Sequence, residues 1–202
     1  MNKAKAKVFQ ARVAQAAPHN YAVGGRVGPE LMHKTCLADF DIRTRAVLHK
    51  FDVSNAHNEF DRKAALSEIE KNIPELFPWV RAELCIGVNH VYIGASGKHV
   101  ELEKTTGGDQ GDPMVGLIFP LVFEAAIENT LTQVRVKDPA ARAYGYQDDV
   151  DMIHLPDLTN EASAIFGQEC AKIGLRANTS KEGVALARDL RLEDAPSCYN
   201  VC

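Results

Sequence analysis

The stretch that decides the fold is Tyr144-Gly145-Tyr146-Gln147-Asp148-Asp149-Val150-Asp151-Met152-Ile153. Apolar runs at 143–146 and 150–155 flank the acids, which predicts two strands joined by a tight turn. Neighbouring carboxylates at the tip of an apolar hairpin repel each other, so a site that keeps them ionised usually needs a cation. Mg²⁺ fits, because it prefers oxygen ligands and is commonly held by carboxylates together with substrate phosphates. An ordinary polar turn, in which Asp is also favoured, explains the same residues without a ligand.

A second acid stands at the end of another predicted strand. Residues 45–52 (RAVLHKFD) place Val47, Leu48 and Phe51 around polar positions and end in Asp52. If this strand lies beside the hairpin, Asp52 meets the Asp148–Asp149 pair. The three carboxylates would then form a platform for two-metal phosphoryl chemistry.

A glycine-rich loop precedes the longest predicted helix. Residues 107–113 read Gly-Gly-Asp-Gln-Gly-Asp-Pro, with Pro113 at the first helical position. Free backbone N–H groups and the positive end of the helix could receive a phosphate or a sugar there. The alternative is an ordinary helix start, in which Asp112 is the N-cap and no ligand is needed.

The rest of the chain is predicted to be one unit of mixed strands and helices. A short hairpin is expected at 91–93 and 100–102, with helices at 3–16, 29–40, 62–72, 74–85, 113–131 and 158–173. Strands and helices alternate without a regular βαβ period. This pattern predicts an α+β fold, with helices packed on one face of an antiparallel sheet.

Composition excludes several classes of protein. The chain has 202 residues, of which 46% are hydrophobic and 25% charged, so disorder, a collagen and a disulfide-rich miniprotein are excluded. The longest apolar run, 115–123, is interrupted by Gly116 and Pro120 and is far shorter than the roughly 20 residues of a membrane span, so no membrane partner is expected. Five scattered cysteines without a signal peptide predict an intracellular protein, with nucleus and cytoplasm both open.

Charge is distributed unevenly along the chain. Residues 1–50 carry 9 Lys plus Arg against 3 Asp plus Glu, a net charge of +6, whereas the remainder carries 14 against 24, a net charge of −10. A polyanion can approach the first part while the second holds a carboxylate cluster. From charge alone, a solvated basic helix at the N-terminus is the favoured interpretation.

Four motifs in order resemble those of the reverse transcriptase family, particularly the reverse transcriptase domains of non-LTR retroelements. A glycine-containing segment and helix at 21–34 (YAVGGRVGPELMHK) also looks like the region that precedes the first motif in that family, and the resemblance covers about residues 20–186. The motifs are residues 51–56 (FDVSNA) with 60–62 (FDR), 107–119 (GGDQGDPMVGLIF), 146–149 (YQDD) and 174–181 (GLRANTSK).

The resemblance implies a right-hand polymerase palm with two Mg²⁺ ions, or Mn²⁺ as an alternative. By this match Asp52 and Asp148 hold the metals, the carbonyl of Val53 assists and Asp149 completes the cluster. One metal would lower the pKa of a primer 3′-hydroxyl and the other would neutralise the triphosphate as pyrophosphate leaves. The implied partners are a nucleic-acid primer-template and dNTPs.

Other positions receive substrate roles from the same resemblance. Gln110 and Gly111 would contact the incoming nucleotide and the template base. Lys181 would protonate the leaving pyrophosphate or bind the triphosphate; an exposed loop lysine is the alternative. His57 stands where the family usually carries Phe or Tyr beneath the sugar, and it can donate a hydrogen bond to a 2′-hydroxyl, which predicts weakened sugar discrimination. Arg26, with the lysines of the first helix, is the nearest cation that could replace the basic strand of the fingers.

The match also implies how the chain divides. Residues 1–45 correspond to partial fingers, 46–190 to the palm and 191–202 to a tail, with no thumb or endonuclease motif. A further polypeptide could supply those parts. Two other interpretations stay open: a catalytically silent palm remnant that binds nucleic acid or a protein, and a diguanylate cyclase, whose Gly-Gly-Asp signature sits on a hairpin between strands and does not lead into a helix.

Overall fold

The computed structural model describes residues 2–24, 27–85, 88–191, 193 and 200–201. Its first half contains α1 (Asn2–Ala16), α2 (Gly28–Asp41), β1 (Val47–Phe51), α3 (Ala56–Glu59), α4 (Arg62–Asn72), α5 (Phe77–Cys85), β2 (Val88–Ile93) and β3 (His99–Lys104). The second half contains α6 (Pro113–Arg135), β4 (Arg142–Tyr146), β5 (Asp149–His154), α7 (Thr159–Lys172), β6 (Gly183–Leu186) and β7 (Asn200–Val201), with 3-10 turns at Pro156–Leu158 and Thr179–Lys181.

The main sheet has the strand order β4-β5-β1-β6-β7. The β4, β5, β1 and β6 strands are antiparallel, and the two-residue β7 adds in parallel at the edge. In the register of β1 with β5, Val47 lies opposite His154 and Phe51 opposite Val150. The predicted neighbourhood of the two acidic strands is therefore present in the sheet.

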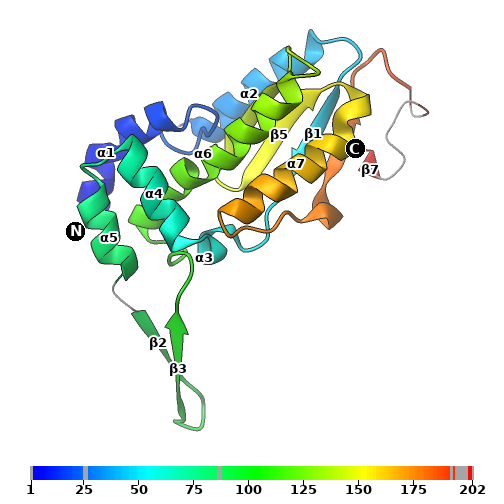
Figure 1. Ribbon diagram of the computed structural model, residues 1–202. Coiled ribbons are helices and arrows are strands. Elements are labelled where there is room, and N and C mark those ends of the chain that lie inside the picture. The colour runs from blue at the N-terminus through cyan, green and yellow to red at the C-terminus, as the bar shows by residue number, and fades with distance from the viewer. Residues whose placement is uncertain (1, 25–26, 86–87, 192, 194–199, 202) are drawn as a thin grey trace.

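The α6 helix forms the centre of the molecule (Figure 1). It begins at Pro113 after the N-cap Asp112, whose side chain accepts a hydrogen bond from the Met114 N–H at 2.8 Å. By length and composition α6 could cross a membrane, but 78% of its most apolar 18-residue window is buried inside the protein. Such burial is that of a core helix.

Helices cover both faces of the sheet, whereas the sequence predicted helices on one face only. The α4, α6 and α7 helices share one hydrophobic core with inward side chains of the sheet, among them Phe51, Val150 and Met152. In addition, α2 packs against the opposite face near β4, where Met32 and Cys36 contact Tyr144 and Ile153. The α1 helix lies along α6 and adds Val13 to the main core.

A second, two-stranded sheet of β2 and β3 projects away from the body (Figure 1). It is longer than the predicted hairpin, because β2 spans Val88–Ile93 and β3 spans His99–Lys104. The pairing brings Ile93 opposite His99 and Val88 opposite Lys104, at the base where the glycine-rich loop begins.

Other elements also differ from the sequence prediction. The helix predicted from residue 74 begins at Phe77, because Ile73, before Pro74, has non-helical backbone angles (φ −143°, ψ 69°) and Pro74-Glu75-Leu76 form a turn. The short helix α3 and the edge strand β6 were not predicted. Each has four residues, too few to show a helical or strand period.

Candidate active site

The end of the β1–β5 pair gathers the three predicted carboxylates. Phe51 is the last residue of β1 and lies opposite Val150 of β5, so the next residues outward, Asp52 and Asp149, are neighbours. Tyr146 pairs with Asp149, which leaves Gln147 and Asp148 as a two-residue turn between β4 and β5. Residues nearly a hundred positions apart in the sequence therefore meet at one edge of the sheet.

The carboxylates differ in their surroundings. Asp52 is largely enclosed, its side chain 17% exposed, and its Oδ2 accepts a hydrogen bond from Asn178 Nδ2 at 2.9 Å. Asp149 is 54% exposed and lies 3.6 Å from Lys50 Nζ. Among the described residues no hydrogen bond or ion pair reaches the Asp148 carboxylate, which is partly exposed. Of the three carboxylates, Asp148 is thus the one to which no described protein donor is bound.

The segment around Asp52 is tied to the fourth motif. Val53 forms an isolated antiparallel bridge with Ala177, and its side chain is buried in the core. The Asn178 N–H donates to the Asp52 carbonyl at 2.9 Å, and the Lys181 Nζ lies 3.3 Å from Asp52 Oδ2. The structure therefore brings Lys181 to the carboxylates, with its side chain 66% exposed and free to reach a ligand.

His57 connects three of the motifs. It belongs to α3, its Nε2 lies 3.0 Å from Gln147 Oε1, and its ring lies 4.5 Å from the ring of Phe119 on α6. The His57 carbonyl accepts a hydrogen bond from the Gly108 N–H at 2.8 Å. The side chain predicted to lie beneath the sugar is thus adjacent to the acidic turn and to the glycine-rich loop.

The glycine-rich loop is fastened at its start and open at its tip. Gly107 has φ +52°, and its N–H donates to the Phe60 carbonyl, while a Cβ there would lie 2.3 Å from the carbonyl carbon of Asn58. The Lys104 Nζ donates to the Gly108 carbonyl at 2.6 Å and to Asp109 Oδ1 at 2.8 Å. Gln110 and Gly111 are exposed, as contacts with a substrate require.

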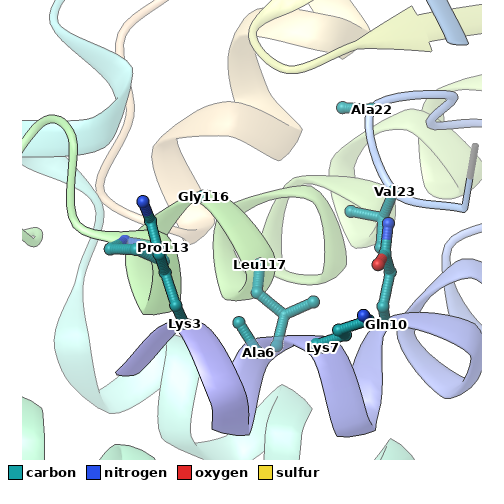
Figure 2. Close-up of a pocket in the computed structure, with 9 residues that line it drawn as sticks. All are labelled: Lys3, Ala6, Lys7, Gln10, Ala22, Val23, Pro113, Gly116 and Leu117. Carbon is teal, nitrogen blue, oxygen red and sulfur yellow. The ribbon is translucent and has the colours of Figure 1, made fainter. Parts of the chain in front are cut away.

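The predicted cations near the N-terminus lie elsewhere. Arg26 is outside the described residues. Lys3 and Lys7 of α1 line a cavity of about 430 Å³ against Pro113 and Leu117 of α6, where the Lys3 side chain extends toward Pro113 (Figure 2). None of the predicted catalytic residues lines this cavity, although it adjoins the helix start that follows the glycine-rich loop.

Two groups of polar residues were not found from the sequence. Asn20 is 2% exposed and contacts the turn that carries Asp148. His49 and His154 lie side by side in the sheet, both fully buried, with His49 Nδ1 3.2 Å from His154 Nε2. No local sequence signal marks either group, because each contact joins residues more than 100 positions apart.

Comparison with known proteins identifies the fold. No protein-family model matches the chain, and no curated protein matches its sequence. Solved telomerase structures do match: apo telomerase from Candida tropicalis has a TM-score of 0.68 at 12% identity, over 91% of this chain and 36% of that chain. The chain has the fold of a polymerase palm.

Other telomerase structures give the same result. Telomerase from Candida albicans in complex with a TWJ fragment of telomeric RNA has a TM-score of 0.67 at 10% identity, over 92% of this chain and 36% of that one. The Candida tropicalis enzyme with the same kind of RNA fragment has a TM-score of 0.66 at 12% identity, over 90% and 32%. The chain spans about a third of the length of these telomerases, which are reverse transcriptases.

Proposed function

We propose that the chain is the catalytic palm of a reverse transcriptase of the non-LTR retroelement type. It would join a nucleotide from a dNTP to a primer 3′-hydroxyl on an RNA template. The observation that carries the proposal is the meeting of Asp52 with Asp148 and Asp149 at one edge of a palm sheet. The four motifs support it, and so do the telomerase structures, two of which hold a telomeric RNA fragment.

The residues at this edge fit a pair of Mg²⁺ ions. All three side chains offer carboxylate oxygens, which Mg²⁺ prefers, and no described donor occupies Asp148. Asp52, Asp148, Asp149 and the carbonyl of Val53 would hold the ions, with Mn²⁺ as a substitute. When bound, the ions supply a lower pKa for the attacking hydroxyl and positive charge for the leaving pyrophosphate.

The chain's own residues would bind and orient the substrates. Lys181 exchanges its contact with Asp52 for one with the triphosphate, which its exposed position permits. The tip of the glycine-rich loop, Gln110 and Gly111, would touch the incoming nucleotide and the template base. His57 would lie under the sugar, where its contacts with Gln147 and Phe119 fix the ring.

One observation favours a second candidate, a silent palm that only binds nucleic acid or a protein. Residues 51–202 carry a net charge of −10, and polymerases gain much of their template affinity from cationic contacts with phosphates. A further polypeptide could supply such contacts.

The deciding experiment is primer extension on a homopolymer RNA template with Mg²⁺ and dNTP. Wild-type protein is compared with Asp148→Asn and with Asp157→Asn, a matched change at an exposed aspartate outside the site. We expect extension by wild type and by Asp157→Asn, and a loss of about 1000-fold in Asp148→Asn, because metal-held charge stabilisation is worth several kcal/mol. Extension by Asp148→Asn at the wild-type rate would contradict the assignment. No extension by any variant would favour the silent palm.

A further inference from the structure

Asn20 lies in a short segment that extends the edge of the palm sheet. This segment follows α1 and runs beside β4, with a parallel bridge between Asn20 and Gly145. The Tyr21 N–H donates to the Gly145 carbonyl at 2.8 Å, and the Gly145 N–H donates to the His19 carbonyl at 2.6 Å. Gly145 permits the approach, since a Cβ would lie 3.3 Å from the His19 carbonyl oxygen and 3.1 Å from the side chain of Ile127.

The segment is also anchored to α6. The His19 backbone N–H and its ring Nδ1 both reach Glu124 Oε1, at 3.3 and 2.6 Å, and the ring lies 3.5 Å from Glu128 Oε2. Although these three side chains could surround a metal ion, a hydrogen-bonded ion pair accounts for the close His19–Glu124 contact. Asn20 is therefore held in place by the backbone hydrogen bonds of its two neighbours, His19 and Tyr21, and by the His19 side chain.

The Asn20 side chain directs both its donor and its acceptor at one residue. Its Nδ2 donates to the Gln147 carbonyl at 3.0 Å, and its Oδ1 accepts from the Gln147 N–H at 3.2 Å. The same Oδ1 accepts from the Ala22 N–H at 3.1 Å, which fixes the amide orientation.

Gln147 needs such support. Its φ is +54°, the left-handed region that favours glycine, and a side chain there persists only where surrounding contacts determine it. Asp148 follows in the same turn and Asp149 begins β5. Because Asp149 is fixed by its pairing with Tyr146, the backbone angles of Gln147 set where Asp148 lies relative to Asp149.

We propose that Asn20 is a positioning residue for the acidic turn: its amide holds Gln147 in the left-handed conformation and so aims Asp148 and Asp149 at a shared cation site. This inference rests on the proposed function for its consequence, while its structural basis is independent of it. Outer contacts of this kind typically change metal affinity or activity 10- to 100-fold.

The test compares Asn20→Ala with Asp138→Asn, a change to a buried, hydrogen-bonded residue at the opposite end of the sheet. Two quantities are measured on folded protein: primer-extension kinetics, and the affinity of the protein alone for Mn²⁺ by electron paramagnetic resonance. For Asn20→Ala we expect kcat and Mn²⁺ affinity each to fall about 10-fold, with KM for dNTP within about twofold. Asp138→Asn should leave both near wild type.

A second background separates positioning from general stability. Glycine adopts a positive φ at no steric cost, so Gln147→Gly should relieve the need for the amide clamp. In that background Asn20→Ala should lower Mn²⁺ affinity by no more than about twofold. Asn20→Asp, which keeps the acceptor and loses the donor to the Gln147 carbonyl, provides an independent variant if the alanine protein does not fold.

The outcomes distinguish this inference from the proposed function. An inactive wild type whose Mn²⁺ affinity still depends on Asn20 overturns the polymerase proposal and supports the positioning role. An active wild type in which Asn20→Ala and Asn20→Asp match the kcat and Mn²⁺ affinity of Asp138→Asn overturns the positioning role. An equal loss of Mn²⁺ affinity in both Gln147 backgrounds overturns it as well, and a wild type that binds no Mn²⁺ overturns both.

Discussion

Two aspartates at opposite ends of the palm sheet differ in their hydrogen bonds with the rest of the protein. Asp138, near the end of β5, is 4% exposed and accepts hydrogen bonds from the Arg43 guanidinium, from the Leu155 N–H at 2.9 Å and from the Ala140 N–H at 3.3 Å. Asp148, at the turn before β5, accepts none from the described residues. One carboxylate is saturated with protein donors and the other is left available.

The difference separates a carboxylate that is bonded within the protein from one that can bind a ligand. Removal of a buried carboxylate with a full set of donors leaves those donors unpaired, and such a carboxylate cannot bind a cation without losing them. At the other end Asn20 bonds the backbone of the turn and leaves the Asp148 carboxylate available to a ligand. Stability and binding are thus divided between the two ends of one strand pair.

The largest expected effect is on stability at the Asp138 end. Asp138→Ala leaves Arg43, whose side chain is 15% exposed, without its carboxylate partner, and should reduce the free energy of unfolding by about 3–5 kcal/mol. Asp148→Ala should change it by less than about 0.5 kcal/mol, because no protein contact is lost. Urea unfolding of both variants measures the difference. An equal decrease in the free energy of unfolding of the two variants would contradict the proposed difference between the two ends.

The next effect concerns the pH dependence set by His154, which neighbours the Asp138 end. Burial is the main cause that lowers the pKa of His154 to about 4, although its hydrogen bond to the Leu155 carbonyl opposes this. The unfolded chain takes up the proton near pH 6.5 and the folded protein does not, so stability is present above pH 6.5 and is lost as pH falls to about 4. The loss should total about 3 kcal/mol, at about 1.4 kcal/mol per pH unit.

The measurement is urea unfolding at intervals between pH 7 and 4, with His154→Gln as the comparison. That variant carries no titrating group at this position and should show a smaller decrease over the same range. If both proteins lose the same stability, other groups must be responsible.

A smaller effect tests the Asp148 end with metal alone. Addition of 10 times the dissociation constant of Mg²⁺ should stabilise the wild type by about 1.4 kcal/mol, since a ligand that binds only the folded state stabilises it by mass action. Asp148→Asn should show less of this stabilisation, while Asp138→Asn should keep it. The measurement is the melting temperature with and without Mg²⁺. If Mg²⁺ raises the melting temperature of Asp148→Asn as much as that of the wild type, the cation binds elsewhere.

The smallest effect concerns sugar selection beside the acidic turn. His57→Phe removes a ring that can donate to a 2′-hydroxyl, so it should increase the preference for dNTP over rNTP by about 5- to 10-fold, about 1 kcal/mol. The ratio of kcat/KM for the two nucleotides on one template measures it. An unchanged ratio would remove His57 from sugar selection.

Much of this architecture could be predicted from the sequence, and the exceptions share a cause. The strand before Asp52, the hairpin around Asp148 and the helix from Pro113 follow from local period and capping. That the two acidic strands are neighbours was implied only by the resemblance to reverse transcriptases. Asn20 could not be found, because its importance lies in a contact with Gln147 that only the folded sheet creates. The short β6 and α3 were missed for lack of length, and Pro74 displaced the start of α5 to Phe77.

The Asn20–Gln147 contact also has a consequence for how the protein is made. Its two residues are separated by 127 positions, so at ribosomal rates of about 5–20 residues per second Asn20 is synthesised roughly 6–25 s before its partner. For most of that interval neither α6 nor β4 has been synthesised, so α1 and the segment after it cannot pack against them. The acidic turn can take its final form only after most of the chain has emerged, so assembly of the catalytic edge would be a late step in folding.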